Sequence, residues 1–359
     1  MKKTLVVLLL SVPACHVHAQ SSVTLYGIVD EGLTYVSNVN GHSNYVLDSG
    51  IIQGNRFGLR TVEDLGGGLS TVADIEFGFN LGTGVQASAF RQSYVGLISQ
   101  KWGQVSMGRQ YDPMAEFIVN DSSIPYIGIY TSTELDIDRL AGEAIPNTIK
   151  YISPEWVGVK IGAIYGFSNA AGAFGGTANA PRWVGAAVSF DNHQNFGIAT
   201  GFTNVNGSGG SLAQALTGAN AQKVFDVGAH YTFEAITVMG TYTRASLDGV
   251  PKLGTIRATE YKALVLYQYR PDTAFGVGYN HSVWTQGRWG TFVANVDYLL
   301  SKRTDVYAMT AYQKSYSANI HPSIVDVNGA IGVPGAQNEA GASSNGRQLV
   351  TQIGIRTKF

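Results

Sequence analysis

Much of the chain is built from runs of residues in which apolar side chains alternate with small or polar ones. In residues 195–203, phenylalanine, isoleucine and threonine take every second position, and mainly asparagine, glycine and alanine take the positions between. The same alternation recurs in residues 260–269 and 292–298. Because successive side chains of a β-strand point to opposite faces, each run predicts a strand with one face suited to lipid and one suited to water. The chain is therefore predicted to be all-β.

Two kinds of connection separate these runs. Seven are short reversals rich in turn-forming residues, at 63–68, 100–103, 154–155, 191–193, 233–234, 271–272 and 301–303. Eight are longer, at 38–50, 82–88, 111–146, 167–181, 204–223, 246–256, 285–289 and 316–347. Together they predict sixteen strands with short turns at one end and long loops at the other, an asymmetry typical of a transmembrane β-barrel.

No apolar run after residue 14 reaches the roughly 18 residues that a membrane-spanning helix needs. A membrane role therefore requires strands, and strands in lipid must form a closed sheet because every backbone N–H and C=O group needs a partner there. The first strand, residues 23–29, is accordingly predicted to pair with the last, residues 352–359. A soluble β-sandwich or propeller would also alternate, but no blade-length repeat occurs. We expect a sixteen-stranded antiparallel transmembrane β-barrel.

The N-terminus begins Met-Lys-Lys, continues with an apolar run at residues 5–10, and reaches a small-residue cleavage pattern ending at Ala19. This arrangement is typical of a secretory signal peptide. A lipidation site around Cys15, the only cysteine, is the alternative, but the proline two residues earlier fits such a site poorly. We expect residues 1–19 to be a signal peptide and residues 20–359 to be the barrel, with no plug domain before the first strand.

The charge balance excludes one class of partner. Removing the two N-terminal lysines from the 24 basic residues leaves 22 against 25 acidic ones, a formal charge of −3. That balance provides no basic excess for nucleic acid. The histidines after residue 19 are scattered, with no pair at metal-ligand spacing, and neither a GxSxG motif nor a Walker lysine occurs. We expect no catalytic residue, no metal and no cofactor.

A strand-poor stretch interrupts the alternation at residues 111–146. Seven acidic residues lie in it against one basic residue, and they are Asp112, Glu116, Asp121, Glu134, Asp136, Asp138 and Glu143. A connection of this length inside a compact fold is usually functional, and basic residues flank it on the neighbouring predicted strands. We predict that this loop folds into the barrel and narrows it.

Seven segments, in this order, carry a family resemblance: SSVTLYGIVDEGL (21–33), NRFGLRTVEDLGGGL (55–69), FRQSYVGL (90–97), MGRQYDP (107–113), NTIKYISPEW (147–156), LSKRTDVY (300–307) and the final GIRTKF (354–359). The chain resembles the trimeric general-diffusion porins of Gram-negative outer membranes, in particular the branch typical of β-proteobacteria. Each segment alone is only weakly specific for this family. Their occurrence together, in this order over nearly the whole chain, is highly specific for it.

The resemblance implies an inward-folded third external loop whose acidic residues face basic residues of the barrel wall. Carried over by motif, the basic residues are Arg56, Arg60, Arg91 and Lys150. The acidic residues are Asp112, Glu116 and Asp121, and the four later acids either line the pore or lie in a solvated part of the loop. Lysine at 150, often arginine in relatives, and the apolar residues of 124–140 depart from the common form. These departures leave pore size and ion preference open.

The alternation supports an inward direction for two of these residues. Arg56 and Arg60 alternate with Phe57 and Leu59. Arginines facing lipid would each cost roughly 2–4 kcal/mol near the membrane midplane, so we expect both to face the lumen. There they set the ion selectivity of the pore or anchor the acidic loop, and the two roles are compatible.

The resemblance also implies a function and partners. The implied function is a water-filled channel for passive diffusion of small hydrophilic solutes and ions; a barrel acting mainly as an adhesin or enzyme is the alternative. The implied partners are two further copies in a homotrimer, outer-membrane lipid, lipopolysaccharide, and the barrel-insertion machinery, whose signal the terminal Phe359 resembles. The wall expected to form the trimer contact is rich in small residues, namely Gly27, Gly32, Gly58, Gly78 and Gly96.

Overall fold

The computed structural model describes residues 21–86, 89–122, 126, 128, 136–141, 144–317 and 343–359. The predicted signal peptide lies outside these residues, as do Glu134 and Glu143 of the acidic loop. Within the described ranges, no helix is long and apolar enough to cross a membrane.

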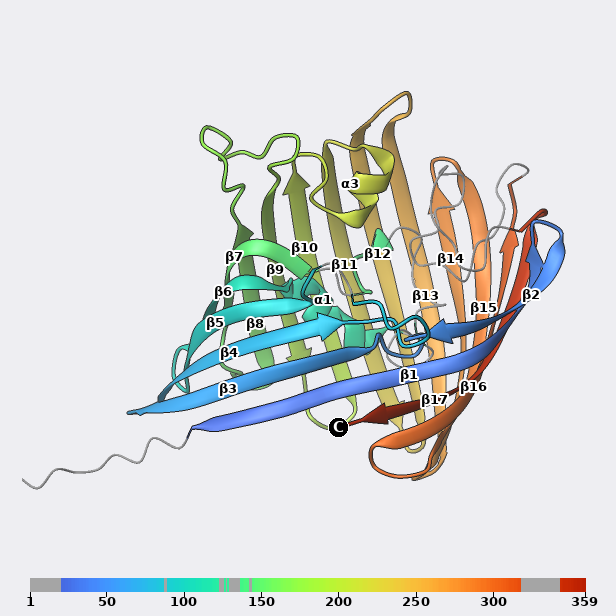
Figure 1. The fold of residues 1–359 in the computed structure, drawn as a ribbon, viewed down its shortest axis with the longest axis horizontal. Helices are drawn as coiled ribbons and strands as arrows, with labels where there is room; N and C mark the ends of the chain where they lie inside the picture. Colours follow the sequence, from blue (N-terminus) through green and yellow to red (C-terminus); the bar gives the residue numbers. More distant parts are fainter. Residues whose placement is uncertain are drawn as a thin grey trace, which may run out of the picture.

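The described residues form one antiparallel sheet of seventeen strand segments. The first nine are β1 (Ser22–Val39), β2 (His42–Ser49), β3 (Arg56–Gly66), β4 (Leu69–Gly78), β5 (Gln92–Ser99), β6 (Gly103–Tyr111), β7 (Ala144–Ile152), β8 (Val159–Gly166) and β9 (Arg182–Asp191). The others are β10 (Phe196–Asn206), β11 (Ala221–Phe233), β12 (Ile236–Val250), β13 (Gly254–Arg270), β14 (Thr273–Trp284), β15 (Gly287–Leu299), β16 (Thr304–Ser315) and β17 (Arg347–Lys358). The connections contain short helices: α1 (Pro113–Ile118), η1 (Val119–Asp121) and α3 (Leu212–Thr217) (Figure 1).

The sheet closes because β1 pairs with β17, as predicted. The paired residues are Ile28–Val36 rather than the expected 23–29, and the first residues of β1 pair with β3 instead. Because the strands of a barrel are tilted, the register between the first and last strands is staggered, and the two ends of the chain lie at different heights along the barrel axis. The closure ends at Gly27 and Phe359, whose backbones exchange two hydrogen bonds of 3.0 and 3.1 Å.

One strand position is divided between two segments. β2 and β3 both pair with the same edge of β1, with Ser49 opposite Glu31 and Arg56 opposite Ile28. The barrel therefore has the sixteen positions that the sequence predicts. Residues 50–55, between β2 and β3, leave the hydrogen-bonded ladder as a short loop, which is called the bulge below. The Asp30 carboxylate fixes this loop by accepting the backbone N–H groups of residues 52 and 53 at 2.7 and 2.9 Å.

The seven short reversals connect strands where the sequence predicts them. Three of the predicted long connections are wrong, because 38–50, 246–256 and 285–289 are mostly strand. β1 and β2 turn at Asn40 and Gly41, both with positive φ (51° and 97°). Asn-Gly is a strong signal for a two-residue hairpin turn, and it is readable in the sequence.

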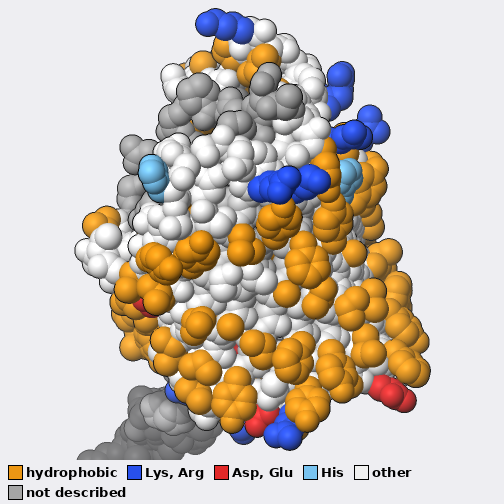
Figure 2. Space-filling view, turned by 90° about the vertical axis from the view of Figure 1, so that its right-hand side faces the viewer, with side chains coloured by type: hydrophobic (Ala, Val, Ile, Leu, Met, Phe, Trp, Pro, Cys, Tyr) orange, Lys and Arg blue, Asp and Glu red, His pale blue; other side chains and the backbone are white. Residues whose placement is uncertain are grey.

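The outer surface of the wall is apolar. Every second residue of the strands is exposed and mostly hydrophobic, for example Phe202 at 44% and Val238 at 50%. On the face shown in Figure 2, hydrophobic side chains cover the middle and lower part and lysines and arginines lie above them. An apolar band of this kind is the lipid-facing surface of a transmembrane barrel.

Candidate functional site

The acidic loop begins with helix α1, which lies against the inner faces of β8–β11 (Figure 1). Glycines make room for it. A Cβ atom at Gly162 would lie 2.5 Å from Cβ of Pro113, one at Gly201 2.6 Å from Cγ of Met114, and one at Gly228 2.8 Å from Cβ of Asp121. Ala199 and Gly201, two of the small residues of 195–203 that were predicted to face water, are therefore covered by the loop.

Asp112 holds the start of this helix and does not line open water. Its Oδ1 accepts the backbone N–H of Ala115 at 2.7 Å as an N-cap. Its Oδ2 accepts Nε of Arg139 at 2.8 Å, and both side chains are 0% exposed. The Arg139 guanidinium lies 4.5 Å from the ring centre of Trp183 on β9. Asp112 is thus part of a buried ion pair that ties the two ends of the loop together.

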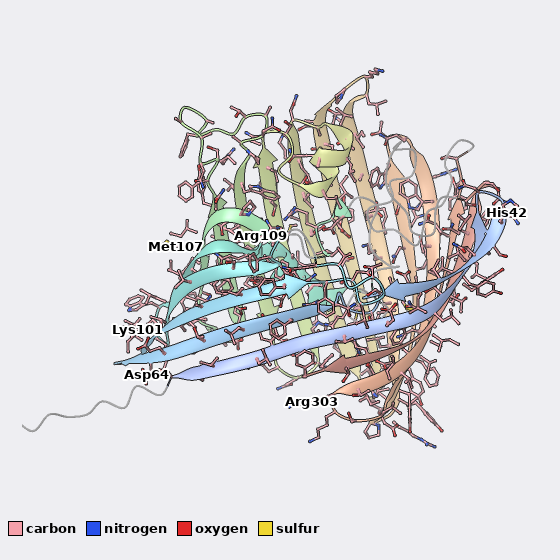
Figure 3. The ribbon with its side chains drawn as sticks, in the orientation of Figure 1. His42, Asp64, Lys101, Met107, Arg109 and Arg303 are labelled. Atoms are coloured by element: carbon pink, nitrogen blue, oxygen red, sulfur yellow. The ribbon has the colours of Figure 1, made fainter. Side chains whose placement is uncertain are left out.

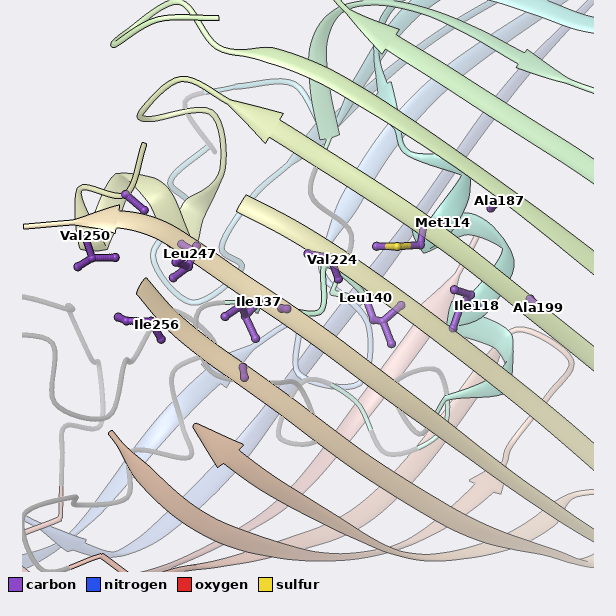
Figure 4. Close-up of a cluster of buried hydrophobic side chains, with 14 residues drawn as sticks. Met114, Ile118, Ile137, Leu140, Ala187, Ala199, Val224, Leu247, Val250 and Ile256 are labelled. Carbon is purple, nitrogen blue, oxygen red and sulfur yellow. The ribbon is translucent and has the colours of Figure 1, made fainter. Parts of the chain in front are cut away.

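The later part of the loop is also buried. Ile137 and Leu140 pack with Met114, Val224 and Leu247 in a hydrophobic cluster against the wall (Figure 4). Asp138 lies beside this cluster and accepts Nζ of Lys262 on β13 at 2.6 Å, and both side chains are buried. The prediction that the later acids line the pore or lie in solvent is wrong for Asp136 and Asp138, which are 3% and 0% exposed. The neighbouring apolar side chains draw them to the wall.

Among the loop acids that the structure describes, Glu116 keeps the most exposed side chain. Its carboxylate accepts Nζ of Lys150 at 2.6 Å, and its side chain remains 32% exposed while that of Lys150 is 5% exposed. Burial raises the pKa of Glu116 above its ordinary value, and Lys150 opposes part of the rise. The sequence-predicted pair of Lys150 and a loop acid is therefore present.

Asp121 contacts the wall through a histidine. Its Oδ1 lies 2.5 Å from Nδ1 of His230 on β11, and its side chain is 6% exposed. Burial raises the pKa of Asp121, and His230 opposes part of the rise. A Cβ atom added to Gly197 would lie 2.3 Å from Cε1 of His230, so the glycine leaves room for the histidine ring. This histidine was not among the predicted site residues, because an isolated histidine in a strand carries no pattern.

Two of the predicted wall arginines are paired within the wall itself. Nε of Arg91 donates to Glu76 at 2.8 Å, and Nη1 of Arg60 donates to Asp74 at 3.5 Å. The hydroxyl of Tyr26 also donates to both carboxylates, at 2.8 Å to Asp74 and 3.1 Å to Glu76. These acids lie outside the predicted loop, so the basic wall is partly neutralised by its own strands.

Arg56 differs from the other predicted arginines. Its Nε donates to the backbone oxygen of Gly54 at 2.9 Å. Among the described residues, no carboxylate lies within ion-pair distance of its guanidinium. Arg56 and Lys358 both lie opposite Ile28 in the sheet register, one on each side of β1. With strands about 4.8 Å apart, their Cα atoms are about 10 Å apart.

A hollow in the barrel interior is lined in part by Lys358. Its lining includes Gln53 of the bulge, Tyr126 of the loop, and Arg356 and Lys358 of β17. Nη1 of Arg356 donates to Oε1 of Gln53 at 3.3 Å, and Nδ2 of Asn295 on β15 donates to the backbone oxygen of Tyr126 at 2.8 Å. The sequence reasoning missed Gln53, Arg356 and Lys358. Alternation along 354–359 was the available signal for the last two.

Two other basic residues near the loop in sequence have contacts outside it. Arg109 lies at the end of β6 on the same strand face as the exposed Met107, and its Nε donates to the backbone oxygen of Phe90 at 2.6 Å (Figure 3). Lys160 pairs with Glu155 at 3.0 Å beside the β7–β8 turn.

The sequence matches the family model described as Gram-negative porin over residues 4–317. An outer membrane porin protein of Bordetella pertussis is 28% identical over 379 residues, which cover 88% of this chain and 95% of the relative. Outer membrane porin protein 32 of Delftia acidovorans is 28% identical over 377 residues, which cover 100% of both chains.

Solved structures agree with this assignment. The anion-selective porin from Comamonas acidovorans has a TM-score of 0.78 and 25% identity, covering 95% of this chain and 100% of that chain. OmpT of Vibrio cholerae in its trimer form has a TM-score of 0.69 and 17% identity, covering 94% and 99%, and supports the fold alone. The closed barrel, the apolar outer surface and the match over most of the sequence show that this chain belongs to the Gram-negative porin family and is a β-barrel porin of the outer membrane.

Proposed function

We propose that the loop and the basic wall form the constriction of this porin and that the pore prefers small hydrophilic anions. The observation that carries the proposal is an imbalance in pairing. Arg56 and Lys358 have no carboxylate within ion-pair distance in the part of the chain that the structure describes, whereas Glu116 is paired with Lys150 and Asp121 with His230. An unpaired cation in a narrow wet gap attracts anions more strongly than a neutralised pair does.

The position of Glu116 supports a loop acid facing the basic wall. Lys150 on β7, one of the basic wall residues, binds the carboxylate of Glu116 on α1 at 2.6 Å. In this arrangement the acids orient dipolar solutes while the unpaired cations set the sign of the selectivity. The relative from Comamonas acidovorans is itself described as anion-selective, which is consistent with this sign.

Reversal potentials test the proposal directly. The purified protein in a planar bilayer, with a tenfold salt gradient, is expected to give a potential whose sign corresponds to anion preference. The preference is expected to shrink at molar salt, where the Debye length falls to about 3 Å. A cation-selective potential at low salt would overturn the proposed sign.

We also propose that three copies of this chain assemble through the outer faces of the first strands. Leu25 on β1 and Leu59 on β3 are exposed and apolar on that surface. The glycines expected there do not all contribute. Gly58 lies under the ring of Tyr26 and Gly32 lies under Gln352, so both glycines face inward. Gly78 and Gly96 also face inward, because each lies an even number of residues from inward-facing residues of its own strand. Chemical cross-linking in mild detergent is expected to stop at three subunits, and a monomer in the membrane would contradict this.

Phe359 is proposed to act both in closure and as the signal for insertion. Its ring packs on Gly27, where an added Cβ would lie 2.3 Å from Cζ of the phenylalanine. Deleting Phe359 is expected to lower the amount of heat-modifiable barrel in the outer membrane. Replacing Gly27 with valine keeps Phe359 but prevents its ring from packing on β1. This variant therefore separates loss of the insertion signal from loss of the contact that closes the barrel. A normal barrel level in the deletion strain would refute the signal role.

A further inference from the structure

The hollow lined by Lys358 has a small side chain between two larger ones. Ala274 on β14 lies opposite Gln268 of β13 on one side and opposite Asp297 of β15 on the other. Because the alanine side chain is short, it leaves space between its neighbours, and the hollow has a volume of about 440 Å³. The Gln268 amide is held toward the β13–β14 turn, because its Nε2 donates to the backbone oxygen of Thr273 at 3.2 Å. The hollow is therefore large enough for a small organic solute.

One side of the hollow carries a carboxylate that the protein neutralises only weakly. Asp297 lines the hollow, and its side chain is 26% exposed. Its Oδ2 lies 3.6 Å from Nη2 of Arg356, which is longer than a hydrogen bond, and its Oδ1 has no hydrogen-bond partner in the described part of the chain. Nε of Arg356 instead donates to both oxygens of Asp305, at 3.0 and 3.1 Å. The Asp297 carboxylate is therefore free to accept hydrogen bonds from a cationic ligand.

Another side of the same hollow carries an ammonium group. Lys358 on β17 lines it, and among the described residues no carboxylate lies within ion-pair distance of its Nζ. Asp297 and Lys358 thus face one hollow but stand too far apart to neutralise each other. A simple anion or a simple cation can satisfy only one of these two charges. A molecule that carries both an ammonium and a carboxylate group can satisfy both, because hydrogen bonds between ionised partners are stronger than neutral ones.

We propose that this hollow is a binding site for a small zwitterion of the amino-acid class. The ammonium group of the solute contacts the Asp297 carboxylate, and its carboxylate contacts Nζ of Lys358. Ala235 and Ala274, which also line the hollow, lie beside short turns, and short turns mark the periplasmic end of such a barrel. Binding is weak, in the millimolar range, because a diffusion channel has to release its solute. The inference rests on the proposed function only in requiring an open lumen, and it does not use the anion preference.

Ligand-observed NMR titration of the detergent-purified full barrel tests the site. The probes are L-alanine, its uncharged isomer lactamide, and lactate, which has the carboxylate without the ammonium group. We expect the wild type to bind L-alanine about tenfold more tightly than lactamide, as for a charged hydrogen bond, and to bind lactate with intermediate affinity. Asp297→Asn is expected to lose about tenfold in affinity for L-alanine. It is not expected to weaken lactate, because it removes only the partner of the ammonium group.

Two further variants separate the charges of the hollow from its shape. Lys358→Gln is expected to weaken L-alanine and lactate alike, because both use the carboxylate contact. Ala274→Leu keeps both charges but fills the hollow, and it is expected to abolish L-alanine binding. Glu234→Gln is the matched control for Asp297→Asn, since it removes one negative charge from an exposed turn at the same end of the barrel, and we expect wild-type binding. Heat-modifiable mobility verifies that each variant is a folded barrel.

Three outcomes would overturn the zwitterion site: equal binding of L-alanine and lactamide by the wild type, unchanged L-alanine affinity in Asp297→Asn, or an equal loss in Glu234→Gln. Lactate binding as tightly as L-alanine would also overturn it, since a simple anion site needs no carboxylate partner. Reversal potentials of the same wild-type preparation separate this result from the proposed selectivity. A wild type that prefers anions but does not distinguish L-alanine from lactamide refutes the zwitterion site alone, and one that binds L-alanine but prefers cations refutes the anion preference alone.

Discussion

Much of the inner face of β8–β11 is covered by the loop, which also reaches Lys262 on β13, whereas on β1–β6 and β17 charged side chains face the lumen. The covered side contains the buried Asp112–Arg139 and Asp138–Lys262 pairs and a hydrophobic cluster. The other side keeps Arg56 and Lys358 without a partner carboxylate in the described structure. The same alternating strands thus build a protein core on one side of the barrel and a pore lining on the other. The difference is decided by what covers the strands.

The largest expected effect comes from breaking the buried pair on the covered side. Arg139→Met leaves the Asp112 carboxylate buried without its cation, and loss of one partner of a buried pair costs about 3–5 kcal/mol. We expect the loop to detach, so single-channel conductance rises and protease cuts within residues 111–146. Lys160→Met, which removes an exposed pair worth about 0–1 kcal/mol, serves as the control. Unchanged conductance and protease resistance in Arg139→Met would show that the ion pair does not hold the loop.

A smaller effect is expected from filling the space beneath helix α1. Gly162→Ala places a methyl group 2.5 Å from Pro113, and overpacking of this kind costs about 1–3 kcal/mol. Protease is expected to reach the loop at a lower urea concentration than in the wild type. Gly175→Ala meets no atom within 4 Å and is expected to behave as the wild type. Equal urea dependence for the two variants would mean that the helix does not rest on this glycine.

On the lumen-facing side we expect a change in selectivity with the barrel intact. Arg56→Ala with Lys358→Ala removes these two cations, each worth roughly 1 kcal/mol to an ion about 4 Å away in water. The anion-to-cation permeability ratio is expected to fall about fivefold for each charge removed. Reversal potentials at 0.1 M salt measure this ratio, with Lys302→Ala and Arg303→Ala as the matched loss of two charges. A ratio no different from that control would place the selectivity elsewhere.

The smallest expected effect is a pH dependence from Glu116, which among the loop acids in the described ranges keeps a partly exposed side chain. The pKa of Glu116 is raised, so on acidification its carboxylate takes up a proton at a higher pH than an ordinary exposed glutamate. Loss of that negative charge is expected to increase anion preference as pH falls. Glu116→Gln is expected to remove this part of the pH profile of the reversal potential. The same profile in wild type and variant would assign the titration to another group.

Some features of the candidate site could be predicted from the sequence, and others could not. Alternation predicted that Arg56 and Arg60 share a face opposite to that of Phe57 and Leu59, which are exposed in the structure. The family motifs predicted that Lys150 faces acids of the loop, and in the structure it binds Glu116. They did not reveal that Asp112 is a helix cap buried against a residue 27 positions later. Nor did they show that Asp74 and Glu76 neutralise the arginines beside them, since that requires knowing the register between strands.

The sequence by itself determined the strand pattern, the seven short turns, the closure of the sheet and the membership of the porin family. The strand pattern and the turns follow from local properties, because side-chain direction has a period of two and turns have their own residue preferences. Closure follows from the need to pair every backbone group in lipid, and the family resemblance from the order of the seven segments. The tertiary structure decided which inward residues are covered and which stay in water. It placed Ala199 under helix α1 and left Lys358 beside the lumen. Burial and charge pairing depend on contacts between residues far apart in the chain, and no local pattern encodes those contacts.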